Sequence, residues 1–418
     1  MTAYWHPFAD MAAVARHGEL VLASGSGSTV VDTDGREYLD ATGALWFCNV
    51  GHGRAEIARA VQEQMGALAS YSTFGDVAPA VTLELAGRLV ARSPHPDGSV
   101  FLTSGGSDAV DSAIKLALRY WEEVGQSERT TVIRRSGAYH GMHLGGTAIA
   151  GIAANRTRAT DGGIRSVEVA WDDAEDLHAT IARLGAANVA AFFCEPVLGA
   201  GGVWAPPDGY LQRVEEICGE HGVLFVLDEV ITGFGRLGHT FAAERFGLSP
   251  DLILFAKGVT SGYLPLGGMV AGPRVMEPFW SEPGRATWRH GYTYSGHAAV
   301  AAAALANLDV LDADGLFAAG DRLEGEIAGT FGALADLDQV EEVRAGTGAL
   351  AAVALHPDLV ASHPALPADV VSAARDRGLL TRVITGGALQ VSPPLCTSTE
   401  QVDAMAARLA DAIGAAGP

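Results

Sequence analysis

Basic residues are scarce in this chain of 418 residues, and this scarcity limits the partners that it can have. Lysine and arginine together number 28, against 49 aspartate and glutamate residues, which gives a formal net charge of −21. So acidic a protein repels the phosphates of nucleic acids and of anionic membrane surfaces. We therefore expect no nucleic acid and no membrane among its partners.

Long apolar runs and paired cysteines are lacking as well. No apolar run reaches the length needed to cross a bilayer, and the first residues lack the basic and apolar regions of a secretory signal. The four cysteines are too scattered for a CxxC metal clip and too few for a disulfide framework. We therefore expect a cytoplasmic protein whose thiols are reduced and buried.

The sequence is rich, by contrast, in short apolar segments that alternate with helical stretches between residues 99 and 271. The expected strands lie at 99–103, 131–134, 189–194, 223–227, 252–256 and 268–271. This alternation predicts an α/β fold whose mainly parallel sheet has helices on both faces. In such sheets, ligands bind beyond the carboxyl ends of the strands.

Outside this region the sequence predicts a smaller α+β part. Strands are expected at 19–23, 29–32 and 36–40, with 24–28 as a plain connector. Helices are expected at 297–309, 318–335 and 399–413, and further strands at 340–343 and 350–355. We predict three parts: an N-terminal segment, 1–60, that belongs to the small domain, a large domain, 61–310, and a C-terminal small domain, 311–418.

Lys257 follows five apolar residues, 252–256, which are typical of a fully buried strand. Burial disfavours the charged form of an amine, so it lowers the lysine pKa and leaves a nucleophile. Such an amine can form a Schiff base with a carbonyl compound, as it does in enzymes that use pyridoxal phosphate. The alternative is a lysine that extends from the strand end into water.

The turn after the strand at 99–103 could hold a phosphate. Small residues, 104–107, lead there into a helix with one apolar face. Free amides at Gly106 and Ser107 and the positive end of the helix dipole would then face the anion. The same residues also fit a plain helix start with Ser107 as its N-cap.

Two acids stand at the ends of other strands, Asp228 after 223–227 and Glu195 after 189–194. A buried acid needs a cation or strong donors, and a protonated pyridine nitrogen is one such partner for Asp228. A helix-capping or metal-binding aspartate would explain Asp228 equally well.

An aromatic ring and two histidines, Tyr139, His140 and His143, follow the strand at 131–134. The spacing of the histidines could form half of a metal site. Glycine weakens a helix there, however, and no second pair of histidines or cysteines lies nearby in the sequence. We therefore predict no metal site.

Nine segments extend these observations along the chain from about residue 4 to the end. In order, they are YWHPF, VVDTDGREYLDATGALWFCNVGHG, FLTSGGSDAVDSAIKLA, SGAYHGMH, CEPVLGAGGV, LDEVITGFGRLG, PDLILFAKGVTSGYLPLGG, HGYTYSGHAAVAAAALA and LLTRVITGGALQVSPPL. In these segments the chain resembles the class III, or omega, aminotransferases of the fold type I pyridoxal phosphate enzymes. The resemblance implies that the large domain binds this cofactor.

The resemblance also implies roles for single residues. Lys257 would carry the cofactor as an internal aldimine and then shuttle the proton between substrate and cofactor. Asp228 would pair with the pyridine nitrogen, and Val230 and Tyr139 would sandwich the ring. His140 is expected in the same cofactor site.

The phosphate and the subunit partner follow from the same resemblance. Gly106 and Ser107 would hold the phosphate together with Thr293 of the neighbouring subunit. Glu195 would support the network around Asp228. A site shared in this way implies a homodimer.

The expected substrate residues are Trp46, Tyr139, Arg382 and, from the partner subunit, Phe74. Arg382 would pair with a substrate carboxylate, although a surface salt bridge would also explain it. The implied reaction is a ping-pong exchange from an omega-amino acid or amine to a keto acid, pyruvate or 2-oxoglutarate, and the overall resemblance favours pyruvate.

Two alternatives remain open. An aminomutase or racemase of the same fold would keep the cofactor but need no second keto acid. A metal-dependent enzyme or a catalytically silent binding protein would use His140, His143, Glu195 and Asp228 instead.

Overall fold

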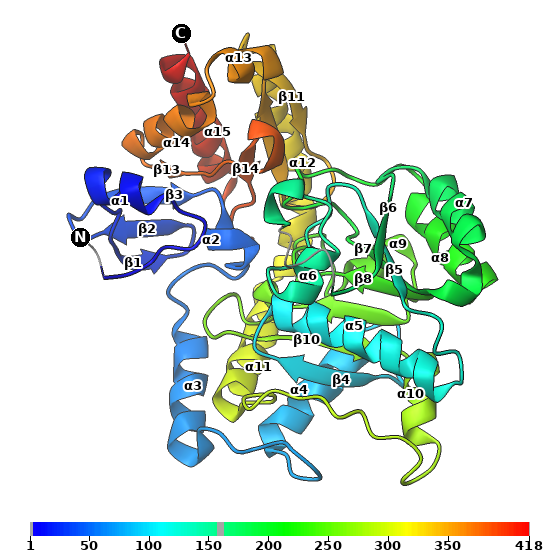
Figure 1. Cartoon of the computed structure of the whole chain (residues 1–418). Helices are drawn as coiled ribbons and strands as arrows, with labels where there is room; N and C mark the ends of the chain where they lie inside the picture. The colour runs from blue at the N-terminus through cyan, green and yellow to red at the C-terminus, as the bar shows by residue number, and fades with distance from the viewer. Residues whose placement is uncertain (1–2, 157–162, 418) are drawn as a thin grey trace.

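A seven-stranded sheet forms the centre of the computed structural model, which describes residues 3–156 and 163–417 (Figure 1). The strand order is β4-β10-β9-β8-β7-β5-β6, and only β10 runs antiparallel to its neighbours. The strands are β4 (Ser99–Thr103), β5 (Thr131–Arg135), β6 (Ser166–Val169), β7 (Val189–Cys194), β8 (Leu224–Asp228), β9 (Leu252–Phe255) and β10 (Gly267–Ala271). The predicted α/β fold with a mainly parallel sheet is confirmed.

Helices cover both faces of this sheet, which explains why its central strands are apolar at every position. Leu224 and Val226 of β8 pack with α5 (Gly106–Glu123). The alternate residues, Phe225 and Leu227, belong to the cluster that includes α7 (Ala174–Leu184) and α8 (Tyr210–His221). Successive side chains of a strand point to opposite faces, so a strand buried on both faces shows no polar alternation.

Two smaller sheets lie beside the large one. The first has the order β1-β2-β3-β13 and the second the order β11-β12-β14. Their strands are β1 (Leu22–Ser26), β2 (Thr29–Asp32), β3 (Glu37–Asp40), β11 (Val340–Arg344), β12 (Ala351–Leu355), β13 (Leu379–Leu380) and β14 (Leu389–Val391). Because β13 pairs with β3, the N-terminal strands lie beside the C-terminal helices (Figure 1). The domain limits given above stay a prediction.

The remaining helices are α1 (Met11–His17), α2 (Gly43–Trp46), α3 (Ala55–Leu68), α4 (Ala80–Ala91), α6 (Leu144–Ala148), α9 (Ala242–Phe246), α10 (Pro273–Trp280), α11 (Ala298–Ala313), α12 (Leu316–Gly332), α13 (Pro357–Ser362), α14 (Leu366–Asp376) and α15 (Thr399–Ala416). The long helix α11 packs against α3 and α4. In Figure 1, α11 lies to the left of β4 and β10, beside α3.

The structure corrects two expectations about short strands. The segment 24–28 is not a plain connector, because β1 runs from Leu22 to Ser26 and turns at Gly27, whose φ is +55°. The edge strand β6 was not predicted at all. It has only four residues and includes Glu168, so it shows neither the length nor the apolar run of the central strands.

A buried arginine joins the large sheet to the smaller parts. The Arg236 guanidinium donates to Asn49 Oδ1 at 2.7 Å, to the Ala349 carbonyl at 2.9 Å and to the Pro393 carbonyl at 2.7 Å. These three acceptors come from widely separated parts of the chain. A buried cation is costly unless it is hydrogen-bonded. These three bonds of Arg236 therefore hold both smaller sheets in position relative to the large sheet.

Two expectations concern location and thiols. In the described residues, no helix has both the length and the apolar character that crossing a bilayer requires. The cytoplasmic location stays a prediction. Three cysteines, Cys48, Cys194 and Cys218, are buried as expected, whereas Cys396 is only partly buried.

Candidate active site

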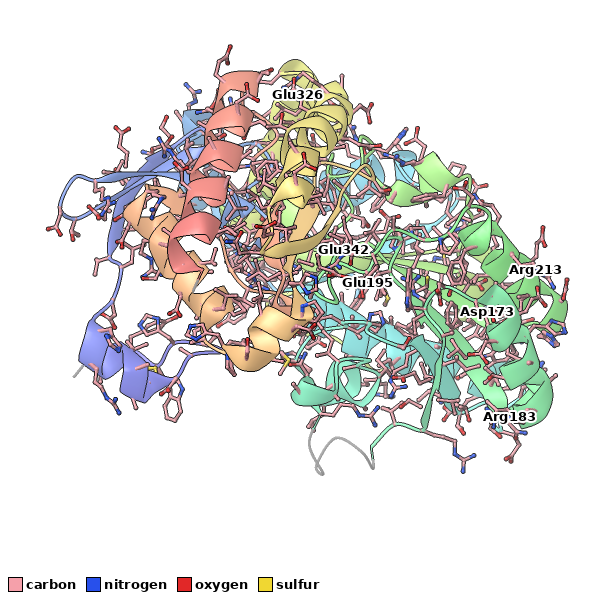
Figure 2. All side chains as sticks on the ribbon, turned by 90° about the horizontal axis from the view of Figure 1, so that it is seen from above. Asp173, Arg183, Glu195, Arg213, Glu326 and Glu342 are labelled. Carbon is pink, nitrogen blue, oxygen red and sulfur yellow. The ribbon has the colours of Figure 1, made fainter. Side chains whose placement is uncertain are left out.

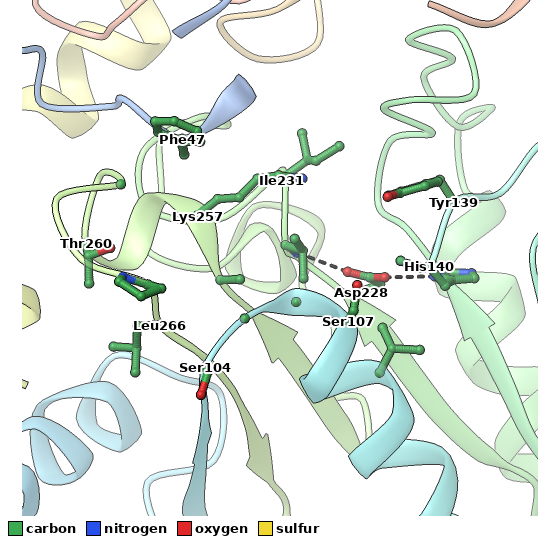
Figure 3. A pocket seen from close by; sticks show the side chains of 18 of the residues that line it. Phe47, Ser104, Ser107, Tyr139, His140, Asp228, Ile231, Lys257, Thr260 and Leu266 are labelled. Carbon is green, nitrogen blue, oxygen red and sulfur yellow. Dashed lines mark hydrogen bonds and ion pairs between the residues drawn. The ribbon is translucent and has the colours of Figure 1, made fainter. Parts of the chain in front are cut away.

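A cavity of about 400 Å³ lies at the carboxyl ends of the sheet strands, where the parallel topology places ligands (Figure 3). Residues that follow β4, β5, β7, β8 and β9 all reach it. Eight of the predicted site residues line it: Gly106, Ser107, Tyr139, His140, Glu195, Asp228, Val230 and Lys257. The order of the strands has therefore gathered residues that are up to 151 positions apart, from Gly106 to Lys257.

Lys257 stands just beyond β9 and projects into this cavity (Figure 3). Its backbone has φ +49°, a value that side-chain-bearing residues rarely adopt. Burial lowers the pKa of Lys257 to about 8, although the negative charges of Asp228 and Glu195 act in the opposite direction. The alternative of a lysine extended into bulk water is wrong.

This lowered pKa predicts a stability effect in the cofactor-free protein. Between pH 8 and 10.5 the unfolded chain binds a proton that folded Lys257 does not, so stability rises with pH across that window. Below pH 8 the buried charge costs up to about 3 kcal/mol. We expect Lys257→Met to raise the unfolding free energy by up to that amount at pH 7, with the gain vanishing near pH 10.5. Urea denaturation across this range measures it, and a gain that does not change with pH would contradict the assignment.

Asp228 is held by two donors at the edge of the cavity. His140 Nδ1 lies 2.8 Å from Asp228 Oδ2, and the Val230 amide donates to Oδ1 at 3.1 Å (Figure 3). The side chains of His140 and Asp228 are both buried. No helix starts at Asp228, since the next one is α9, so the helix-cap alternative is wrong. His140 thus touches the carboxylate, whereas His143 faces Asp108 at 3.4 Å.

Glu195 positions the segment that carries the aromatic ring. Its Oε1 accepts the Tyr139 amide at 2.9 Å and its Oε2 accepts the Gly199 amide at 3.0 Å. Burial raises the pKa of Glu195, and the charge of His140 and these amides counteract the shift. Glu195 therefore holds the loop that carries Tyr139 and His140, and His140 in turn contacts Asp228.

The small residues after β4 form a cradle of backbone amides beside the cavity. Helix α5 starts at Gly106 with Gly105 as its N-cap, so the alternative that made Ser107 the N-cap is wrong. The first amides of a helix have no partner within it. A Cβ on Gly106 would lie 3.0 Å from Val230, and one on Gly141, where φ is +90°, would lie 2.5 Å from Ser107 Oγ. Larger residues at these two positions would crowd the cradle.

The substrate residues divide into two groups. Trp46 is buried, with its ring centroid 5.6 Å from Lys257 Nζ and 4.6 Å from the guanidinium carbon of Arg382. Phe74, which is 61% exposed, and Thr293, which is also exposed, do not reach the cavity of their own chain. The structure of one chain therefore brings Trp46 and Arg382 to Lys257 but leaves Phe74 and Thr293 outside.

Several apolar wall residues were missed by the sequence analysis, among them Phe47, Ile231 and Leu266. Phe47 reaches the cavity beside Gly262, where φ is +77° and a Cβ would lie 2.2 Å from the Phe47 ring. The aromatic pair at 46–47 was a signal, but the sequence does not tell which ring faces inward.

The cavity offers what pyridoxal phosphate needs: an amine for the aldehyde, a buried carboxylate for the ring nitrogen and free amides for the phosphate. The residues present thus fit the expected cofactor. The further alternative, a metal site built on His140, His143, Glu195 and Asp228, has no comparable support, because His140, Glu195 and Asp228 already bind one another or backbone amides.

Comparisons with known proteins also point to an enzyme that uses pyridoxal phosphate. The class-III aminotransferase family matches residues 11–413. An omega-aminotransferase of Caulobacter vibrioides is 36% identical over 437 residues, which cover 99% of this chain and 98% of the relative. A putrescine–pyruvate aminotransferase of Pseudomonas aeruginosa is 34% identical over 95% of this chain and 91% of its own.

A solved structure extends the match to the fold. It is an amine transaminase from an uncultivated Pseudomonas species in its pyridoxal phosphate-bound form, with a TM-score of 0.92 and 34% identity over 100% of this chain and 99% of that one. The expected fold type I architecture and cofactor are confirmed. The chain belongs to the class III aminotransferases, as an omega or amine transaminase that uses pyridoxal phosphate.

Proposed function

We propose that this enzyme moves the amino group of an omega-amino acid or primary amine to pyruvate, with 2-oxoglutarate as a second acceptor. The observation that carries the proposal is the cavity lined by Lys257 and Asp228, beside which the Trp46 ring centroid lies 5.6 Å from Lys257 Nζ and 4.6 Å from the guanidinium carbon of Arg382. The relative from Pseudomonas aeruginosa, whose name gives putrescine and pyruvate as its substrates, supports this choice of donor and acceptor.

Lys257 is the proposed base. Pyridoxal phosphate, when bound, supplies an aldehyde that condenses with amines and a ring that accepts electrons from the substrate carbon. Lys257 would hold the cofactor before substrate arrives and would then move the proton at the substrate carbon. With a pKa of about 8, roughly one such amine in ten is neutral at pH 7, against fewer than about one in a thousand for an exposed lysine.

The other cavity residues position the ring. Asp228 would pair with the ring nitrogen and keep it protonated, and His140 orients this carboxylate. Val230 and Tyr139 line the cavity and would hold the ring between them, while the first amides of α5 would hold the phosphate. The apolar wall excludes water, which strengthens each of these charge interactions.

Arg382 is the proposed carboxylate-binding residue. Its guanidinium stacks on the Trp46 ring, and its buried Nε has no hydrogen-bond partner in the described structure. Burial lowers the pKa of Arg382, which shows that its charge is incompletely solvated. A bidentate substrate carboxylate would satisfy this guanidinium and place the reacting carbon near Lys257.

The substrate assignment is tested by a panel of donors of equal length, 4-aminobutanoate and butylamine, against pyruvate and 2-oxoglutarate. We expect Arg382→Met to lower kcat/KM for pyruvate by about 10- to 100-fold, because a charge-assisted pair is lost. The half-reaction with butylamine should change less than about threefold. Each half-reaction is followed by the change in the cofactor's visible absorption.

The matched control is Arg377→Met, since Arg377 binds the carbonyl of Ala373 on its own helix. It should behave like the wild type with every substrate. Turnover with 2-oxoglutarate but not with pyruvate would contradict the proposal that pyruvate is the amino acceptor. Product formed from a single substrate without any keto acid would favour an aminomutase or racemase.

The proposal includes a homodimer with shared active sites. Phe74 lies beside the Thr293 segment, because its ring is 3.3 Å from a Cβ placed on Gly291, and Thr73 donates to the Ser295 carbonyl at 2.8 Å. One exposed patch therefore contains Phe74 and Thr293, the two residues that would enter the active site of the partner subunit. An apolar hollow of about 870 Å³ on the same side, which includes Phe101 and Trp288, suits burial against a second copy.

Mixing two defective variants tests the sharing. Lys257→Ala removes the amine, and Thr293→Asp places a negative charge where the partner would meet the phosphate. If the sites are shared, one of the two sites in each mixed dimer is intact, so an equal mixture refolded together should regain about a quarter of wild-type activity. No recovery, or a monomer by light scattering, would contradict the shared site.

A further inference from the structure

Two histidines and a glutamate meet on the outer surface of helices α7 and α8, away from the cofactor cavity. His178 lies on α7, and Glu220 and His221 end α8. Figure 2 shows the same two helices at the outer edge of the molecule, marked by Asp173 and Arg213, with Glu195 nearer the centre. The mechanism proposed above uses none of these side chains.

The donor atoms of the three side chains already lie at distances that suit one metal ion. His178 Nδ1 is 3.4 Å from His221 Nε2 and 3.7 Å from Glu220 Oε2, and all three atoms lie within 4.8 Å of one another. Around a tetrahedral zinc ion with bonds of 2.0–2.1 Å, ligand atoms are about 3.4 Å apart. Small side-chain rotations would therefore complete the site.

Neighbouring charged side chains position Glu220 to bind a metal ion. Arg213 Nη1 donates to Glu220 Oε1 at 3.0 Å, which leaves Oε2 directed toward His178. The same guanidinium also binds Glu175 at 2.7 Å and Glu216 at 3.2 Å. Three carboxylates thus share one arginine, and this local excess of negative charge attracts a cation.

We propose that His178, Glu220 and His221 bind a divalent transition-metal ion of the zinc type, with water in the open position. Two imidazole nitrogens and one carboxylate favour Zn²⁺, Ni²⁺ or Cu²⁺ over Mg²⁺ and Ca²⁺, which require oxygen ligands. His178 and Glu220 are 40% and 50% exposed, so a hydrated ion can reach them. Among residues 3–156 and 163–417, no other group of three such ligands is brought together.

A bound ion would join two helices whose ligands are 43 residues apart in the chain. A ligand that binds the folded state and not the unfolded one stabilises the fold in proportion to the logarithm of its concentration. The site is therefore a stabilising clamp on the α7–α8 layer. It is independent of the cofactor and of the substrate proposed above.

The test uses the holoenzyme, freed of metal with a chelator and dialysed against micromolar Zn²⁺. We expect one zinc ion per chain by elemental analysis, and a rise in Tm of about 3 °C when zinc exceeds Kd about 100-fold. His178→Gln and His221→Gln should each weaken binding at least about tenfold, and the double variant should lose both the ion and the rise in Tm. Mg²⁺ should have neither effect.

His363→Gln is the matched control, because His363 is an exposed histidine that pairs with one acid, Asp369, at 2.9 Å. This variant should bind zinc like the wild type. Zinc that remains in the double variant would show that it binds elsewhere, and no binding at micromolar concentration would show that the histidines only hydrogen-bond to each other. Either result overturns the proposal.

Discussion

Replacing Lys257 with alanine should lower kcat by at least about 10⁴-fold. The side chain is the one lysine amine among the residues that line the cavity, its pKa lies near 8, and its Nζ is 5.6 Å from the centroid of the Trp46 ring. Under the role proposed for Lys257, the variant's cofactor would lose its covalent attachment and the substrate proton would lose its base. Each half-reaction, followed separately by visible absorption, should be slowed.

The composition of the chain makes this test unusually clean. Lysine occurs at only two positions, Lys115 and Lys257. Lys115 is exposed on α5 and contacts His290, so Lys115→Arg should keep wild-type activity. Borohydride should fix a cofactor-sized mass on the peptide that contains Lys257. A label on Lys115, or normal turnover by Lys257→Ala, would refute the assigned role.

Replacing Asp228 with alanine should lower kcat by about 10³-fold. The carboxylate accepts His140 Nδ1 and the Val230 amide, so it is fixed before any ligand binds. Under the role proposed for Asp228, its negative charge would stabilise a protonated ring nitrogen, and a protonated ring accepts electrons more readily from the substrate carbon. The loss should appear in kcat more than in KM for the amine donor.

A modified cofactor separates this electrostatic role from a structural one. Pyridoxal phosphate methylated at the ring nitrogen carries a permanent positive charge and needs no carboxylate to maintain it. We expect it to restore activity to Asp228→Ala by at least about tenfold relative to the natural cofactor, while the wild type gains nothing. A variant that is merely misfolded would not respond, and equal responses of both proteins would argue against the ion pair.

The candidate site was predictable wherever a residue ends a strand of the central sheet. Lys257, Asp228 and Glu195 follow segments that are apolar at every position, and the carboxyl ends of parallel strands meet at one edge. The wall of the cavity was not predictable in this way. Phe47 and Leu266 come from loops, whose paths depend on contacts with distant segments.

What the sequence alone determined is the mainly parallel sheet, the residues at its carboxyl edge and the family of the enzyme, because buried strands and their ends leave a local pattern. Only the tertiary structure decided the partners: His140 on Asp228, 88 residues away, Arg382 on Trp46, and β13 on β3. It also showed that Gly105, not Ser107, caps α5. The local sequence of either segment does not identify its partner, so these contacts depend on how the whole chain packs.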